Sequence, residues 1–252
     1  MNVRIIPALS LLDGTLVKTS KFSAPAYVGD PINTIRIFNE LEVDEVCILG
    51  IRTTISNNPP DYKLIEAMAT ECFMPLSYGG GINSLETAKK IFQCGVEKII
   101  LGTSAIQNPS FITQCSLHYG TQAVVVAIDV KKSLFNQYAV MSHSGTVNTH
   151  LHPLKWAQEA EAAGAGEILL TSINREGSWN GFDTVLVKEV SAGVSIPVIA
   201  HGGAGTPQHI SEVIISGASA VAAGSMFLYQ KKGLGILINF PKQKIEEAIA
   251  GI

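Results

Sequence analysis

Two glycine-rich segments, YGGGINS (78–84) and AHGGAGT (200–206), have the composition of phosphate-binding turns. Each follows an apolar run and opens an amphipathic stretch, and a Gly-Thr or Gly-Ser pair comes one apolar run later. Glycine lets an anion oxygen approach backbone amides because no Cβ intervenes, and helix N-termini add unpaired N–H groups. The predicted phosphate-binding residues are Gly80, Gly81, Gly102 and Thr103 in the first half and Gly202, Gly203, Gly224 and Ser225 in the second.

One such turn alone would be explained by tight packing between a strand and a helix. Two copies at nearly equal spacing favour phosphate binding, and they predict a long ligand with a phosphate or similar anion at each end. The second copy matches the phosphate site that many (βα)8 barrels form after their last two strands.

A single carboxylate, Asp129, ends the apolar run VVVAID and is a candidate for proton transfer. The segment RIIPALSLLDG (4–14) repeats the pattern of AVVVAIDVKKS (123–133), so Ser10 occupies the position equivalent to Asp129. A serine hydroxyl does not cycle a proton near neutral pH without an activating base. Lys18 lies shortly beyond Ser10 and is expected to neutralise a phosphate or a carboxylate.

Four charged residues stand where apolar runs begin, which would place them in a ring at the opposite end of the fold. These residues are Arg4, Glu45, Lys98 and Glu167. Two positive and two negative charges satisfy one another and avoid the cost of isolated buried charge. Taken alone, the ring predicts a salt-bridge layer that closes the fold at this face, since features there usually serve stability.

The elements that must position these residues are short β-branched runs that alternate with amphipathic stretches. The predicted strands are Arg4–Leu9, Glu45–Gly50, Met74–Tyr78, Lys98–Gly102, Ala123–Asp129, Glu167–Thr171, Pro197–His201 and Ala220–Gly224. The clearest predicted helices are Asp30–Leu41, Ser84–Cys94, Pro153–Ala163 and Thr206–Ser216.

This alternation predicts an α/β fold, a (βα)8 TIM barrel built from two related half-barrels. The 252 residues are the usual length for one such barrel, and 46% hydrophobic against 15% charged residues suits strands buried on both faces. No linker or low-complexity tract divides the chain, so residues 1–252 are expected to form a single domain.

Composition narrows the function classes. A net charge of −3 provides no broad basic field, so no nucleic-acid partner is expected. No apolar run is long enough to span a bilayer and no signal-peptide cleavage site follows residues 4–12, so a cytoplasmic protein without a membrane partner is expected. The four cysteines lack metal-ligand spacing, and the sequence predicts neither a metal site nor a cofactor.

Several of these motifs together resemble the cyclase subunit (HisF) of imidazole glycerol phosphate synthase. The resemblance covers nearly the whole chain and rests on RIIPALSLLDGTLVK, YGGGI, VVVAID, GAGEILLTSINREG, HGGAG and AAGSMF. It implies a barrel that receives ammonia from a HisH-like glutaminase and cyclises a twice-phosphorylated ribulose derivative. It also implies two catalytic aspartates, of which this chain keeps Asp129 and replaces the other with Ser10.

Other positions at the predicted catalytic mouth depart from the family pattern. Gly50 stands where the family has an acidic residue and Gly102 where it has an amide, while Asn174 and Glu176 replace aspartates and His201 replaces a small hydroxyl residue. Together these changes predict a different or lost substrate. Trp179, in the loop after the sixth predicted strand, is expected to form either part of a mobile lid or an exposed packing contact.

The charged ring, in contrast, is intact. In the family a matching Arg, Glu, Lys and Glu form a gate for ammonia, so the resemblance favours the same role for this quartet. The segment KFSAPAYVGDPINTIRIFNELEVDE (21–45) further resembles HisF-like proteins associated with sugar amidation in surface-polysaccharide synthesis. The expected partners are therefore a HisH-like glutaminase at the N-terminal barrel face, a sugar amidotransferase, and a phosphorylated small molecule.

Three functions remain open on this basis. The preferred one is a HisF-like subunit that channels ammonia for amidation of a sugar in lipopolysaccharide synthesis. The second is an active cyclase of histidine synthesis, in which Ser10 and other residues replace the missing carboxylate. The third is a non-catalytic scaffold whose anion sites sense a phosphorylated metabolite.

Overall fold

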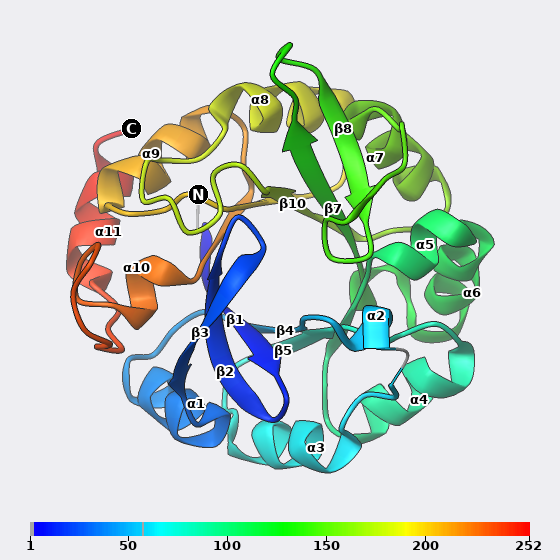
Figure 1. Cartoon of the computed structure of the whole chain (residues 1–252), viewed down its shortest axis with the longest axis horizontal. Coiled ribbons are helices and arrows are strands. Elements are labelled where there is room, and N and C mark those ends of the chain that lie inside the picture. The colour runs from blue at the N-terminus through cyan, green and yellow to red at the C-terminus, as the bar shows by residue number, and fades with distance from the viewer. Residues whose placement is uncertain (1–2, 57) are drawn as a thin grey trace.

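Eight parallel strands form a closed barrel, with helices on its outside (Figure 1). The computed structural model describes residues 3–56 and 58–252. The barrel closes because β1 pairs with β12 on one side and with β4 on the other. In barrel order the strands are β1 (Arg4–Leu12), β4 (Val46–Gly50), β5 (Leu76–Gly79), β6 (Lys98–Leu101), β7 (Val124–Lys132), β10 (Glu167–Ser172), β11 (Val198–His201) and β12 (Ala220–Ala223). The predicted fold class is confirmed.

Five helices of the outer ring begin where a capping side chain accepts a hydrogen bond from a first-turn amide; the caps are Asp30, Asp61, Ser84, Asp183 and Thr206. Proline follows Asp30 and Thr206 directly, as the start of a helix favours. The helices are α1 (Pro31–Glu40), α2 (Thr53–Ser56), α3 (Tyr62–Glu71), α4 (Leu85–Gln93), α5 (Thr103–Gln107), α6 (Ser110–Tyr119), α7 (Pro153–Ala162), α8 (Thr184–Gly193), α9 (Pro207–Ile215), α10 (Ser225–Leu228) and α11 (Lys242–Ala250), with a 3₁₀ turn at Thr121–Ala123.

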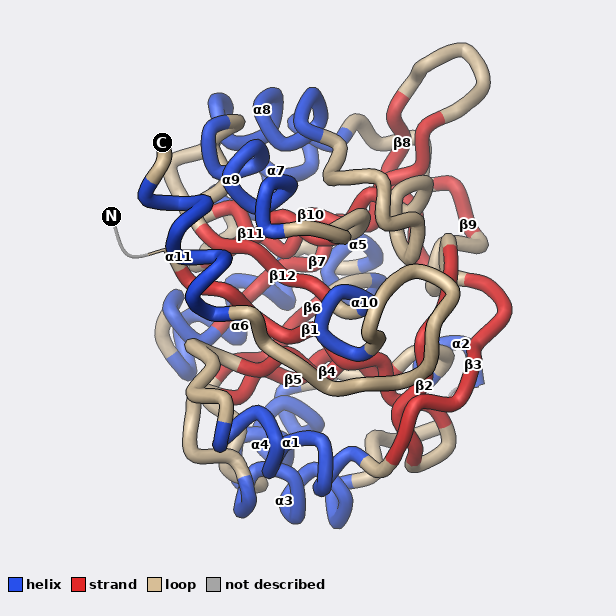
Figure 2. The backbone as a smooth tube through the Cα atoms, turned by 90° about the vertical axis from the view of Figure 1, so that its left-hand side faces the viewer, coloured by secondary structure: helices blue, strands red, loops and turns tan. Residues whose placement is uncertain are grey.

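Two antiparallel extensions, which the sequence did not predict, rise from the carboxyl end of the barrel (Figure 2). The first consists of β2 (Thr15–Ser20) and β3 (Ser23–Gly29) and continues from β1. The second consists of β8 (Tyr138–Ser142) and β9 (Val147–Asn148) and continues from β7. Each half-barrel therefore starts with a strand that carries an extension, and a short helix, α5 or α10, follows its last strand directly, which agrees with the internal repeat.

The apolar core has two layers. The outer layer lies between strands and helices and includes Trp156, Phe38 and Phe227, which are almost fully buried. The inner layer fills the barrel itself, so the barrel is packed rather than open as a pore. Its buried members are Ile6, Ala8, Cys47, Ile100, Val125, Leu169, Ile199, Ala220 and Ala222.

Within residues 3–56 and 58–252, no helix combines the length and the apolar character that crossing a membrane requires. All four cysteines are free thiols. Burial raises the pKa of Cys72 and Cys115 to about 11, which keeps these thiols protonated and unreactive.

Candidate functional site

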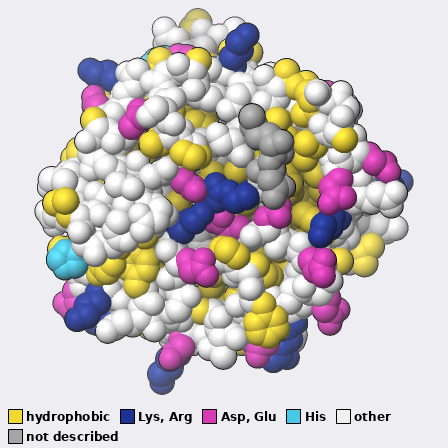
Figure 3. Space-filling model, turned by 180° about the vertical axis from the view of Figure 1, so that it is seen from behind, with side chains coloured by type: hydrophobic (Ala, Val, Ile, Leu, Met, Phe, Trp, Pro, Cys, Tyr) yellow, Lys and Arg dark blue, Asp and Glu magenta, His cyan; other side chains and the backbone are white. Residues whose placement is uncertain are grey.

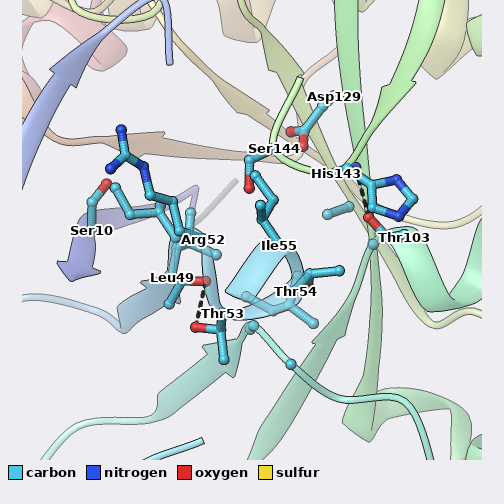
Figure 4. A pocket seen from close by; sticks show the side chains of 18 of the residues that line it. Ser10, Leu49, Arg52, Thr53, Thr54, Ile55, Thr103, Asp129, His143 and Ser144 are labelled. Carbon is cyan, nitrogen blue, oxygen red and sulfur yellow. Dashed lines mark hydrogen bonds between the residues drawn. The ribbon is translucent and has the colours of Figure 1, made fainter. Parts of the chain in front are cut away.

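A cavity of about 650 Å³ opens at the carboxyl ends of the barrel strands. Ser10 and Asp129 both line it, as the sequence comparison of the two halves implied (Figure 4). Polar side chains and backbone from the strand ends and from the segments after β1, β4, β5, β6, β8 and β10 form its wall. Besides Ser10 and Asp129, the lining includes Lys18, Thr19, Arg52, Thr53, Gly80, Gly81, Gly102, Thr103, Ser104, His143, Ser144, Thr171, Glu176 and His201.

Asp129 is a half-buried carboxyl that lies opposite Thr171 in the pairing of β7 with β10. Burial raises the pKa of Asp129 to about 6, and a hydrogen bond from Thr171 partly offsets that rise. A carboxyl with a pKa in this range holds and releases a proton near neutral pH, which suits general acid–base chemistry. The geometry thus gives Asp129 the properties expected of the predicted catalytic residue.

A histidine is connected to this carboxyl through the same threonine. The Thr171 hydroxyl and His201 Nδ1 are 3.1 Å apart. Burial, with a smaller contribution from the charge of Lys18, lowers the pKa of His201 to about 3, so its ring is neutral at physiological pH. If Thr171 donates its hydrogen to Asp129, it accepts from Nδ1–H of His201, and the lone pair of Nε2 remains for a ligand.

No other carboxylate takes the place of the aspartate that Ser10 replaces. Ser10 lies on β1 between Val17 of β2 and Leu49 of β4. Asp13 belongs to an exposed turn with a positive φ of 48° and is not part of the cavity wall. Among the described residues of the wall, the carboxylates are Asp129 and Glu176, and Glu176 is engaged elsewhere. Asp129 is thus the one carboxylate in the cavity wall that is free to accept or donate a proton.

Glu176, which was noted in the sequence only as a replaced aspartate, connects two loops. Its carboxylate accepts hydrogen bonds from Lys18 Nζ, from Thr19 Oγ1 at 3.1 Å and from the Phe22 amide at 3.1 Å, and its side chain is almost fully buried. Its carbonyl accepts from the Lys21 amide at 3.0 Å. Lys18 therefore neutralises a carboxylate of its own chain, and burial lowers the pKa of Lys18 to about 8.

The glycines of the first predicted phosphate site all line the cavity. Gly80, Gly81, Gly102 and Thr103 contribute to the wall, and the Thr103 hydroxyl accepts a hydrogen bond from the His143 amide at 2.9 Å. A Cβ placed on Gly102 would have Ala127 Cβ as its nearest neighbour, at 3.9 Å, so the missing side chain leaves free space in the cavity.

None of the residues of the second predicted phosphate site lines this cavity. A Cβ on Gly224 would lie 3.2 Å from Lys18 Cε, and one on Gly202 would lie 2.7 Å from the Ser172 carbonyl. Gly203 is covered by the segment after β10, whose Gly181 amide donates to the Gly203 carbonyl at 2.9 Å. The structure thus exposes the two sites differently, although the sequence makes them look equivalent.

Gly50 is a position where the barrel has no room for the acidic side chain that the family pattern contains. A Cβ there would lie 2.9 Å from both the Tyr78 hydroxyl and Thr53 Oγ1. Tyr78 is buried at the end of β5. The packing of Tyr78 and Thr53 around position 50 therefore excludes an acidic side chain there.

The charged quartet forms a closed set of ion pairs at the amino ends of the strands. Arg4 bonds Glu45 at 2.6 Å and Glu167 at 2.9 Å, and Lys98 Nζ lies 3.0 Å from Glu45 and 3.3 Å from Glu167. Figure 3, which views the face opposite that of Figure 1, shows basic and acidic side chains gathered near its centre. The predicted ring thus has the geometry that the strand starts implied.

A small interior cavity of about 10 Å³ lies inside the barrel. Glu45 of the ring is part of its wall, and Ile100 and Leu169 line both it and the large cavity. The rest of its lining is apolar apart from Cys47 and Ser77. Its size corresponds to about one water-sized molecule.

Further residues in the loops after β8 and β10 differ in their relation to the cavity. His150 and His152 lie outside it, whereas His143 lines it. Trp179 is part of the segment that covers the second glycine turn, where its carbonyl would lie 2.7 Å from a Cβ on Gly205. Within the described parts of the chain, no cluster of three or more His, Cys, Asp and Glu side chains is arranged to hold a metal ion.

The raised pKa of Asp129 has a measurable consequence for stability. Because about 6 lies above the ordinary carboxyl value of 3.8, the fold favours the protonated form. The contribution of the protonated Asp129 carboxyl to the free energy of unfolding is complete below pH 3.8 and is lost as the pH rises through 6. Asp129→Asn should therefore be more stable than the native chain by about 1–2 kcal/mol at pH 7.5 and should show no gain near pH 3.8.

Urea unfolding at both pH values measures this difference, and Asp13→Asn, at an exposed turn, is the matched control. A gain that is equal at the two pH values, or absent at both, would contradict the assignment of Asp129 as a proton-exchanging carboxyl.

Comparison with known proteins agrees with this geometry. A family profile described as "Histidine biosynthesis protein" matches residues 4–232. The Pseudomonas aeruginosa protein named "Putative imidazole glycerol phosphate synthase subunit hisF2" is 48% identical over 94% of this chain and 95% of its own length. The Leptospira interrogans protein named "Putative imidazole glycerol phosphate synthase subunit HisF" is 46% identical over 99% of both chains. "Imidazole glycerol phosphate synthase subunit HisF" of Endomicrobium trichonymphae is 39% identical over 92% of this chain and 89% of its own. The chain belongs to the histidine biosynthesis protein family, as a HisF-like barrel subunit of the imidazole glycerol phosphate synthase type.

Proposed function

We propose that this barrel binds a glutaminase at its N-terminal face and conducts ammonia along its axis to the mouth. The observation that carries the proposal is that three sites share wall residues along the barrel: Glu45 belongs to the ring of ion pairs and lines the small interior cavity, and Ile100 and Leu169 line both that cavity and the mouth. The resemblance of the sequence to glutaminase-dependent cyclases, together with relatives named as subunits, supports a partner of this kind.

The ring has the properties of a gate. Arg4 bonds both glutamates while 31% of its side chain is accessible, whereas Glu45 is only 3% accessible. Arg4 is therefore the member that moves most easily, and Lys98 still compensates both carboxylates when it does. Buried carboxylates bind an ammonium ion tightly, but the apolar interior beyond them admits only the neutral base without a large desolvation cost.

The use of this ammonia is proposed to be the amidation of a sugar in surface-polysaccharide synthesis, by a separate sugar amidotransferase. Ser10 supports this role, since a mouth with Asp129 as its one free carboxylate lacks the acid–base pair that the family's cyclisation employs. The segment 21–45, which resembles the amidation-associated proteins, supports it as well; here it forms part of the first hairpin, α1 and the turn that leads to β4.

A working cyclase is the second candidate. The arrangement that favours it is the chain of Asp129, Thr171 and His201, in which a neutral imidazole lies next to a carboxyl with a pKa near 6. If Nε2 of His201 substitutes for the missing carboxylate, Asp129 and His201 can serve as the acid and the base of the cyclisation.

The gate is tested with Lys98→Met, which removes the charge and keeps much of the side-chain volume. Loss of two ion pairs should lower glutamine-driven amidation by about tenfold or more. Amidation driven by added ammonium salt should change little, because that ammonia reaches the acceptor without crossing the ring. The measurement is product formation with either nitrogen source in the assembled complex.

Lys90→Met is the matched control, because Lys90 forms an exposed ion pair with Glu86 on α4, away from the ring. Circular dichroism checks that both variants fold. If Lys98→Met leaves the glutamine-driven and ammonium-driven rates in their native ratio, the ring is a purely structural layer.

The cyclase alternative is tested with the barrel, its glutaminase and the ribulosyl intermediate. Loss of one acid–base partner costs roughly 10²–10⁴ in rate, so the native chain should form little imidazole product. Ser10→Asp restores a carboxylate opposite Asp129 and should raise that rate, whereas the matched variant Ser10→Asn, which carries no titrating group, should not.

Native turnover at the level of an ordinary synthase would establish the cyclase function. It would contradict the proposal that the barrel supplies ammonia to a separate sugar amidotransferase. A rate that Ser10→Asp does not raise would show that the missing carboxylate is not what limits cyclisation.

A further inference from the structure

We propose that two exposed turns at the carboxyl end of the barrel bind an anionic lipid surface, into which Leu134, Phe135 and Leu234 insert while the adjacent lysines bind lipid phosphates. The two segments are KKSLF (131–135) and KKGLG (231–235). Each has two adjacent lysines, one small residue and then an exposed leucine. Binding of this kind needs no membrane-spanning segment, since the apolar side chains enter only the headgroup region. It goes beyond the proposed supply of ammonia and does not depend on it.

The first turn connects β7 with β8 at the tip of the second extension. Leu134 is fully exposed and Phe135 is 87% exposed. The Ser133 amide donates to the Gln137 carbonyl at 2.9 Å, and the Asn136 amide donates to the Ser133 carbonyl at 3.1 Å. Figure 2 shows this hairpin extending beyond the helices of the barrel. Two neighbouring apolar side chains are thus held by an ordered turn, away from the core.

The second turn follows α10 and precedes α11. The Leu234 amide donates to the Lys231 carbonyl at 3.1 Å, which closes the turn. Leu234, Ile236 and Leu237 are each half-exposed. A Cβ on Gly233 would meet no atom within 4 Å, so the turn stands clear of the rest of the chain. This turn therefore presents aliphatic side chains in the same way as the first.

The lysines of both turns are free to bind an external anion. Among the described residues, none of these four lysines has a carboxylate partner. Lys132 Nζ instead lies 5.0 Å from the centre of the Tyr138 ring. Apolar side chains beside lysines suit an anionic lipid surface, because the ammonium groups stay among the headgroups when the apolar side chains enter the acyl boundary.

The loops at the carboxyl ends of the strands are basic, although the net charge of the chain is −3. Lys18 and Glu176 compensate each other. The remaining cations are the four turn lysines with Lys21, Arg52 and Arg175, and the remaining carboxylates are Asp13, Asp30, Asp61 and Asp183. Three of these aspartates cap helices, whose positive ends offset their charge. This end of the barrel therefore attracts an anionic surface, and the negative excess lies on the rest of the molecule.

The positions of the two turns suit a fluid surface better than a rigid one. Figure 1 shows the β7–β8 hairpin and the orange loop after α10 at separate places on the outer edge of the barrel. Neither turn lines the cavity of the mouth. A rigid partner would need two matching pockets, whereas a bilayer accommodates both turns. The ring of ion pairs lies at the opposite end of the barrel, so a bound membrane leaves that face free.

The test is sedimentation of the full chain with vesicles of phosphatidylglycerol and phosphatidylcholine in equal parts, and with vesicles of phosphatidylcholine alone. The chain should sediment with the anionic vesicles only, and added salt should weaken the binding because it screens the lysines. Leu134→Ser combined with Phe135→Ser, and Lys131→Gln combined with Lys132→Gln, should each lower the affinity for anionic vesicles by about tenfold or more.

Matched controls carry the same changes elsewhere on the surface. Phe73 precedes β5 and is 86% exposed, and Leu117 lies near the end of α6 and is 82% exposed. Phe73→Ser combined with Leu117→Ser removes the same two residue types at the amino end of the barrel. Lys89→Gln combined with Lys90→Gln neutralises an adjacent lysine pair on α4. Both controls should bind anionic vesicles like the native chain, and thermal unfolding checks that all variants fold.

Insertion is measured separately with Phe135→Trp. Its fluorescence should shift to the blue when anionic vesicles are added, because the side chain leaves water, whereas the fluorescence of Leu117→Trp should not change.

Three results would overturn the proposal: no sedimentation with anionic vesicles, equal loss of binding in the turn variants and the controls, or binding without the blue shift at position 135. If the chain ignores vesicles but the turn variants stop it from binding the sugar amidotransferase, the turns are a protein docking surface and the proposal is wrong.

Discussion

The mutual compensation of four charges at the amino ends of the strands is the interaction on which the rest of this structure depends. Arg4, Lys98 and Glu167 are the first residues of β1, β6 and β10 and Glu45 directly precedes β4, and only a closed barrel brings these four strand starts within bonding distance of one another. Each would be costly to bury alone. Together they form a polar layer at the amino end of a barrel whose interior is filled mainly with aliphatic side chains, beside a cavity of about 10 Å³.

At the other end of the barrel the two halves have diverged in how their loops are used. In the half that begins with β1, the extension β2–β3 bends back over the mouth and is held by Glu176 through Lys18, Thr19 and Phe22. This contact covers the second glycine turn and leaves the first one open. A repeat that is symmetric in sequence thereby becomes a mouth that the first glycine turn lines and the second does not, with Thr171 and His201 hydrogen-bonded in its wall.

The barrel, its strands and the ring of charges follow from local sequence, because buried parallel strands and their first residues leave a strong pattern. The positions of Ser10 and Asp129 follow from the repeat for the same reason. The extensions β2–β3 and β8–β9 were missed, since runs such as TLVKTS and SAPAYVG are short and mixed in polarity. The roles of Glu176 and His201 depend on contacts between residues far apart in the chain, and no local pattern announces them.

The most direct test of the account is hydrogen exchange of the barrel with and without its glutaminase. If the ring is the docking face, the partner should slow amide exchange at the starts of the strands, around residues 4–6, 45–47, 98–100 and 167–169. Exchange in β2, β3 and the segments that line the mouth should be unaffected by docking. Protection confined to the mouth, with unchanged exchange around the ring, would contradict the central claim that ammonia enters through the charged end of the barrel.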